Sequence, residues 1–125
     1  MGAQDNTVEG GYLFNAQTLG ASVNSTICNI SRSTCIGLDL FLDNTNAVGT
    51  IAVQVCNDLT PSSPNWVAVE FSDGTTSIAV ASGTDTTKFI DLADLGAKYL
   101  RVAYTFTSGA GTLTTRAHVK HNVGV

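Results

Sequence analysis

The most constraining stretch of the sequence runs from Lys98 to Lys120, KYLRVAYTFTSGAGTLTTRAHVK, and consists of two alternating arms around a glycine-containing break. Successive side chains of a β-strand point to opposite faces, so each arm has one core face and one wetter face. The break at 108–111 holds two glycines, which can adopt the positive φ that a tight turn requires. The stretch therefore predicts a C-terminal β-hairpin. Its predicted core positions are Leu100, Val102, Tyr104 and Phe106 on the first arm, and Leu113, Thr115, Ala117 and Val119 on the second.

Similar alternation recurs upstream, in segments separated by residues that form turns. In the segment 36–42 every second residue is Ile or Leu, and Phe41 lies on the opposite parity. The break at 57–65 holds both prolines of the chain, which cannot donate to a strand ladder, and is predicted to be a long loop. The further segments predicted to be strands cover 50–56, 66–71, 78–81 and 88–92.

This pattern predicts the fold class. Roughly eight or nine short antiparallel strands with almost no helical periodicity indicate an all-β, two-sheet β-sandwich that is jelly-roll-like and ends in the hairpin. One helical turn is predicted over 91–96, because Gly96 resembles a C-cap glycine. At 125 residues the chain is expected to form one domain. We expect a polar, glycine-rich N-terminal arm over residues 1–11 and a single β-sandwich domain over 12–125.

Charge excludes some classes of partner. The formal net charge is −4, and six Lys and Arg residues are scattered along the chain, so no basic patch for nucleic acid is expected. No apolar run is long enough for a membrane span. Charged residues make up only 13% of the chain, against about 25% in average globular proteins. Sparse charge fits a surface covered by another protein, and it fits an ordinary neutral β domain equally well.

No residue pattern indicates a metal, a cofactor or a catalytic centre. The three cysteines, Cys28, Cys35 and Cys56, are read as buried thiols, and a Cys28–Cys35 disulfide stays open. The loop 43–46 has oxygen donors but lacks the glycine and bidentate Glu of a calcium loop. The Asp residues fall mainly at loop edges, where turn roles explain them, and no Gly-x-Ser-x-Gly motif occurs. The chain is therefore predicted not to be an enzyme.

A family resemblance begins at about Thr50. Its pieces are, in order, VQVCND at 53–58, NWV at 65–67, IDL at 90–92, LGAKYLRV at 95–102, and a final piece with YT at 104–105 followed by TSGAGTL at 107–113. In this order they resemble small β-sandwich structural proteins of tailed bacteriophages. Nothing in the first 49 residues contributes to the resemblance.

The resemblance implies a non-enzymatic structural virion protein: a decoration or cement protein on the capsid surface, which is favoured, or a tail or fibre component. The implied partners are other virion proteins, the major capsid protein among them, and further copies of the chain, with a trimer favoured. The candidate interface residues are Tyr12, Phe14 and Phe41, because apolar side chains outside the expected core suit contacts with neighbouring subunits.

A second interpretation is a carbohydrate-binding jelly-roll module that recognises a cell-surface glycan. Tyr12 and Trp66 are the aromatic side chains that could stack on a pyranose ring if they are exposed. Aromatic residues make up only 7% of the chain, which provides few such platforms.

Overall fold

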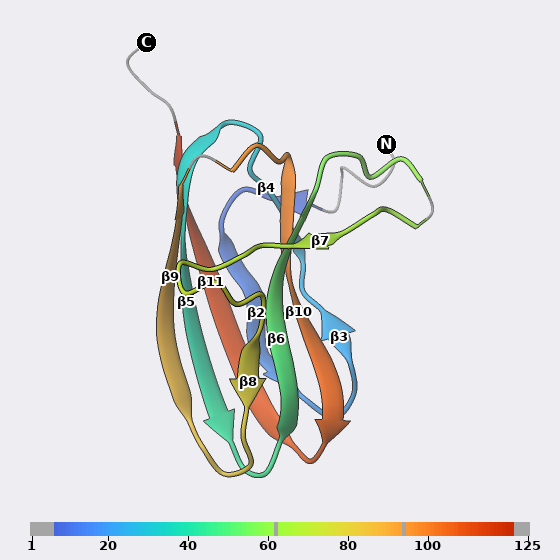
Figure 1. Ribbon diagram of the computed structural model, residues 1–125, viewed down its shortest axis with the longest axis vertical. Coiled ribbons are helices and arrows are strands. Elements are labelled where there is room, and N and C mark those ends of the chain that lie inside the picture. Colours follow the sequence, from blue (N-terminus) through green and yellow to red (C-terminus); the bar gives the residue numbers. More distant parts are fainter. Residues whose placement is uncertain (1–6, 62, 94, 122–125) are drawn as a thin grey trace.

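The computed structural model describes residues 7–61, 63–93 and 95–121, with side chains to Lys120, and in these ranges every regular element is a strand. Eleven strands form two sheets packed face to face (Figure 1). Their bounds are β1 Thr7–Val8, β2 Gly11–Thr18, β3 Val23–Asn24, β4 Ile27–Asn29, β5 Ser33–Asn44, β6 Val48–Cys56, β7 Val67–Ala68, β8 Ile78–Val80, β9 Thr86–Ala93, β10 Tyr99–Ser108 and β11 Gly111–His121.

The strand order is that of a jelly roll. The four-stranded sheet has the order β2-β11-β5-β9. The seven-stranded sheet has the order β1-β4-β10-β6-β7, with β3 also paired to β10 and β8 to β6. The chain passes back and forth between the sheets, so long strands that follow one another in sequence mostly lie in opposite layers. All pairings are antiparallel except β1 with β4, and the predicted all-β two-sheet sandwich is confirmed.

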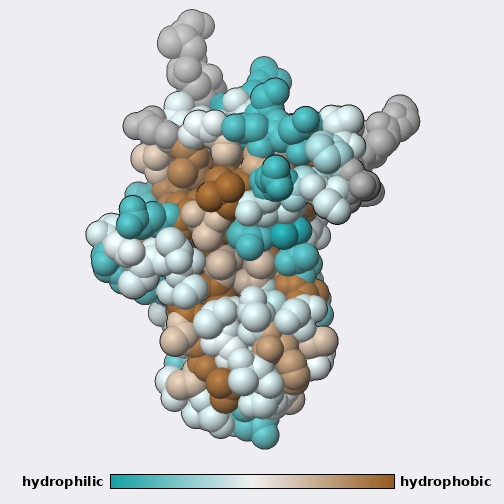
Figure 2. Space-filling model, turned by 45° about the vertical axis from the view of Figure 1, so that its right-hand side comes forward, coloured by the Kyte–Doolittle hydropathy of each residue, from teal (hydrophilic) through white to brown (hydrophobic). Residues whose placement is uncertain are grey.

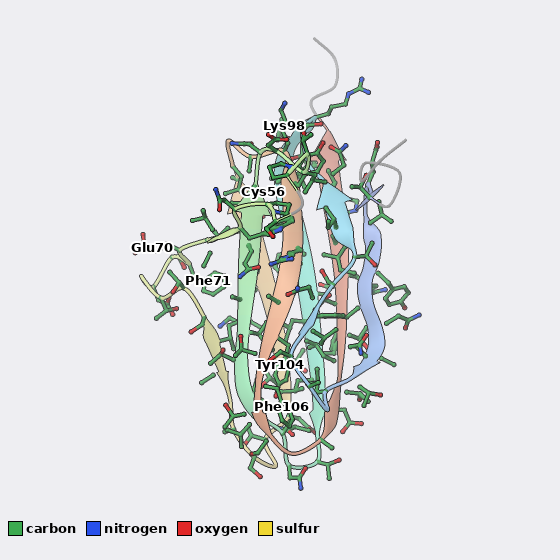
Figure 3. All side chains as sticks on the ribbon, turned by 90° about the vertical axis from the view of Figure 1, so that its right-hand side faces the viewer. Cys56, Glu70, Phe71, Lys98, Tyr104 and Phe106 are labelled. Atoms are coloured by element: carbon green, nitrogen blue, oxygen red, sulfur yellow. The ribbon has the colours of Figure 1, made fainter. Side chains whose placement is uncertain are left out.

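The core lies between the sheets and follows the alternation of the sequence. The even-numbered residues of β5 from Ile36 to Leu42 are all buried, as are Leu100 and Val102 of β10. Tyr104 is the largest fully buried side chain, and its hydroxyl donates to the carbonyl of Val48 at 3.2 Å. Figure 3 shows Tyr104 and Phe106 toward one end of the sandwich, and Cys56 and Lys98 toward the other.

The predicted C-terminal hairpin is wrong, although both of its arms are strands. β10 pairs with β6, with Val102 opposite Val53, whereas β11 pairs with β5, with Ala117 opposite Leu38. The break between the arms therefore carries the chain from one sheet to the other, and the two core faces oppose each other across the interior. Gly109 has φ 81°, as a turn glycine should, but Gly111 does not have positive φ. The connection is an arch between layers.

Three such arches lie together at one end of the molecule (Figure 1). They join β5 to β6, β8 to β9, and β10 to β11, and polar side chains connect them. The Asn44 amide nitrogen donates to the carbonyls of Ala47 (3.1 Å) and Ala81 (2.6 Å), while its oxygen accepts from the Ala47 N–H (2.6 Å). Asn46 joins the last arch, because its side-chain oxygen accepts from the N–H of Ala110 at 2.7 Å. The oxygen-rich loop 43–46 thus ties the arches together.

The structure differs from the sequence-based predictions at residues 91–96 and 66–71, and it shows the state of the cysteines. The helical turn over 91–96 is wrong, since β9 continues as a strand to Ala93; Asp94 lies outside the described residues. The strand predicted over 66–71 shortens to β7. All three cysteines are free, with Cys28 in one sheet and Cys35 in the other.

The N-terminal segment is described from residue 7 onward. Thr7 and Val8 form β1, which pairs with β4, and Gly11 begins β2. Residues 1–6 of the predicted arm lie outside the described residues, so a boundary at residue 11 stays a prediction. In the described ranges, no helix is long and apolar enough to cross a membrane.

Candidate functional site: the outer face of the four-stranded sheet

Three aromatic side chains are exposed on one surface of the molecule. Tyr12 is 50% exposed, Phe41 43% and Phe89 64%, and all three lie on the outer face of the four-stranded sheet. The other exposed large hydrophobic residue in the described chain is Val67, on the seven-stranded sheet. Exposed aromatic rings gathered on one face are a feature of interaction surfaces, so this face is the candidate site.

Strand register places these residues in an ordered row. Tyr12 of β2 is opposite Arg116 of β11, Arg116 is opposite Asp39 of β5, and Asp39 is opposite Phe89 of β9. The row crosses the whole sheet, with an aromatic residue on each edge strand and one charge of each sign on the central strands. We call the surface made by this row together with Phe41 the aromatic face.

The two central charges pair within the face. Arg116 Nη2 lies 3.1 Å from Asp39 Oδ2, and their side chains are 49% and 37% exposed. The Arg116 guanidinium carbon is also 5.8 Å from the centre of the Tyr12 ring, within the range of a cation–π contact. The middle of the face is therefore polar but nearly neutral, and the aromatic rings flank it.

Glycine lets one of these rings lie close to the sheet. A Cβ added at Gly37 of β5 would come within 2.8 Å of Cζ of Phe89, so the ring covers the glycine backbone. Beside it is a shallow hollow of about 580 Å³. The hollow is lined by Gly11, Gly37, Asp39, Phe89, Arg116, Ala117 and His118.

The structure places the predicted interface residues in two environments. Tyr12 and Phe41 are on the aromatic face, whereas Phe14 is 3% exposed and belongs to the core. The cause is an irregularity in β2, whose register against β11 shifts on both sides of Thr115, so that Leu13 and Phe14 are both buried. Phe14 is therefore not available to a partner in this fold. That Tyr12 and Phe41 contact a partner stays a prediction.

Trp66 lies on the other side of the sandwich from Tyr12. Its ring is half-buried beneath the guanidinium of Arg101, whose central carbon is 4.3 Å from the ring centre, and Arg101 Nε donates to Gln54 Oε1 at 2.8 Å. Burial lowers the pKa of Arg101. The two aromatic residues considered for sugar stacking are thus on opposite faces and cannot share one ligand ring.

Figure 2 shows the surface of the molecule turned by 45° from the view of Figure 1, with patches of hydrophobic surface between polar side chains.

Two acidic residues of the loops, Asp58 and Asp73, take the turn roles expected of them. Hydrogen bonds from the Thr60 hydroxyl and N–H lower the pKa of the Asp58 carboxyl, and Thr75 does the same for Asp73. Among the described residues no three His, Cys, Asp or Glu side chains gather as potential metal ligands. Among the described residues, the feature that stands out is therefore the aromatic face.

Comparisons with known proteins support the fold. No protein-family model and no curated protein matches the sequence. Among solved structures, the chain is similar to the SPBc2 prophage-derived protein YomS, with a TM-score of 0.51, 9% identity, and coverage of 86% of this chain and 89% of that one. It is also similar to a chain of the T13 viral particle of infectious bursal disease virus (IBDV), with a TM-score of 0.54, 14% identity, and coverage of 90% of this chain and 30% of that one.

A third similar structure is that of the IBDV Gx strain, with a TM-score of 0.52, 12% identity, and coverage of 91% of this chain and 32% of that one. The chain thus spans about a third of the length of the two IBDV chains. At these identities the likeness is one of fold.

Proposed function

We propose that this protein is a non-enzymatic structural subunit of a virion and that the aromatic face is its contact surface with neighbouring subunits. The observation that carries the proposal is the row of Tyr12, Arg116, Asp39 and Phe89 across a rigid sheet. Aromatic residues and Arg are the side chains enriched at interface hot spots, and strands hold them in place at little entropic cost.

Two further observations support the virion setting. The sequence pieces from Thr50 onward resemble structural proteins of tailed bacteriophages, and the fold is shared with a prophage-derived protein and with parts of virus-particle chains. The low fraction of charged residues reduces the desolvation cost of contacts with neighbours. In a lattice of many copies each contact can be modest, because avidity multiplies it.

Within the virion, the proposed place is the capsid surface, as a decoration or cement protein that stabilises the head. The major capsid protein and further copies of this chain are the proposed partners. The sequence resemblance favours a trimer, whereas the order of side chains on the aromatic face favours a two-fold pair, and the solution mass measured below distinguishes the two.

The proposal is tested on particles of the virus that encodes this chain. Mass spectrometry of purified particles should find the chain in many copies, and recombinant protein should rebind particles from which it has been stripped. Phe89→Ser should reduce rebinding at least tenfold, whereas Val67→Ser, an equally exposed position on the opposite sheet, should not. Absence of the chain from particles would contradict the proposal.

A carbohydrate-binding module is the second candidate, because the shallow hollow lies beside the exposed Phe89 ring, and Tyr12 is on the same sheet face. Aromatic faces can stack on sugar rings while Asp39, Arg116 and His118 offer hydrogen bonds to hydroxyl groups. A glycan array separates the two candidates. Binding that disappears in Phe89→Ser would favour the module, and no signal would remove it.

A further inference from the structure

We propose that the aromatic face binds the same face of a second copy, in a two-fold pair that joins Arg116 of each copy to Asp39 of the other. This inference rests on the proposed function, because it names the occupant of that contact surface. It is carried by the order of side chains in the row, which reads aromatic, positive, negative, aromatic from β2 to β9.

Such an order is complementary to itself. In a face-to-face pair related by a two-fold axis that runs along the strands between β11 and β5, the row meets its own reverse. Arg116 then lies opposite Asp39 of the second copy, and Tyr12 lies opposite Phe89 of the second copy. Every position in the row meets a favourable partner, and each contact forms twice.

The charges also select this axis over the alternative. A two-fold axis along the row itself would place Arg116 on Arg116 and Asp39 on Asp39, which are repulsive contacts. Only the axis along the strands brings opposite charges together. The pair is therefore expected to have one defined orientation.

The neighbouring rows fit the same arrangement. On one side the row consists of His118, Gly37 and Asp91, and on the other of Thr114, Phe41 and Thr87. Under the same rotation His118 faces Gly37 and Thr114 faces Phe41, so in both rows a larger side chain meets a smaller one. Because the Phe89 ring covers Gly37, the incoming His118 would lie against that ring at the edge of the shallow hollow.

The surface area that the pair would bury indicates whether the pair is stable or reversible. Four strands about 4.8 Å apart, each contributing about eight residues with a rise of about 3.3 Å, bury roughly 500 Å² on each copy. A total of roughly 1,000 Å² is at the low end for specific interfaces, so the pair should be weak and reversible.

The two charges make a sharp test possible. Asp39→Arg leaves two positive charges on the face, and Arg116→Asp leaves two negative charges, so each variant should repel its own copy. An equimolar mixture of the two should pair again, since every contact across the interface is then between opposite charges. The mixture separates contacts between copies from the ion pair within one chain, because neither chain regains its internal pair.

Light scattering over a concentration series up to about 500 µM would measure these masses. The wild type should rise from 13.0 kDa toward about twice that value, each single variant should remain at 13.0 kDa, and the mixture should recover the wild-type rise. Circular dichroism and thermal unfolding confirm that the variants are folded. Val67→Asp, on the opposite face, should pair like the wild type.

Three outcomes would overturn self-pairing: a wild type that stays monomeric, a stable trimer, or a mixture that fails to recover. Rebinding of the single variants to stripped particles then tests the proposed function separately. If both variants lose rebinding and the mixture does not pair, self-pairing is wrong and the face contacts a different virion protein.

Discussion

Arg116 and Asp39 occupy directly opposite positions on β11 and β5, and their side chains form an ion pair of 3.1 Å on the outer face of the four-stranded sheet. Both side chains remain well exposed, so water competes with the pair and salt screens it. The positions of these two charges therefore matter more for a partner that binds the face than for the stability of a single chain.

The first prediction follows from this exposure. Asp39→Asn and Arg116→Gln should each change the free energy of unfolding by less than about 1 kcal/mol. Urea unfolding of dilute protein, combined in a double-mutant cycle, measures the coupling directly. A coupling above about 2 kcal/mol would show that the pair holds the sheet together, and the account of it as a surface for partners would fail.

The last arch should depend on its glycine. Gly109 has φ 81°, and a Cβ added there would overlap the carbonyl oxygen of Asn46. Gly109→Ala should therefore lower the free energy of unfolding by at least about 2 kcal/mol, through backbone strain and displacement of the arch. Gly20→Ala is the matched control, because Gly20 has open space around it and should change stability by less than about 0.5 kcal/mol. Equal effects of the two substitutions in chemical denaturation would contradict this assignment.

Asn44 should be one of the most sensitive polar residues. It is 6% exposed, and its amide joins the β5–β6 and β8–β9 arches by hydrogen bonds to Ala47 and Ala81. Asn44→Ala leaves buried backbone groups without partners and should cost about 2–4 kcal/mol. Asn44→Asp should be at least as damaging, because a carboxylate would then face two carbonyl oxygens. Thr45→Ala, at the exposed neighbour, is the control, and a Thr45→Ala loss as large as that of Asn44→Ala would disprove the role.

Stability should fall in alkali because of Cys28. Burial raises the pKa of this thiol from 9.0 to about 11, an effect opposed by a hydrogen bond from the Gly10 backbone and reinforced by the charge of Glu9. The folded protein therefore keeps the proton that the unfolded chain releases near pH 9. The stabilisation is complete below about pH 9 and is lost as the pH rises toward 11, by up to roughly 3 kcal/mol.

The control for this pH dependence is Cys28→Ala, which removes the titrating group. Free energies of unfolding measured from pH 7 to pH 11 should fall less steeply for the variant than for the wild type. Parallel curves would show that the thiol does not titrate with a raised pKa.

Much of the fold was predictable because alternation is a local property. The period of two in β5 places Ile36, Leu38, Leu40 and Leu42 in the core, and the structure buries all four. What alternation does not encode is the partner of each strand. The stretch at 108–111 has the same local signature in a hairpin as in an arch, and the choice depends on distant groups such as Asn46, which bonds to Ala110.

The candidate site was predictable in part for the same reason. Phe41 and Phe89 each have the parity opposite to that of the buried residues on their strands. Phe89 was not named as a candidate from the sequence, but its outward position follows from the parity of Ile90 and Leu92. Phe14 was misplaced because the irregularity of β2 interrupts the alternation. The row itself needs strand register across four segments, and no single segment contains that information.

The aromatic face is the proposed surface by which this subunit meets its neighbours. Photo-crosslinking in assembled particles tests it most directly, with a photoreactive amino acid at position 89 and, as a control, at position 67 on the opposite sheet. Position 89 should crosslink efficiently to a virion protein, and in a two-fold pair to the peptide of a second copy that contains Tyr12. Efficient crosslinks from position 67 with none from position 89 would place the contact on the seven-stranded sheet and rule out the aromatic face.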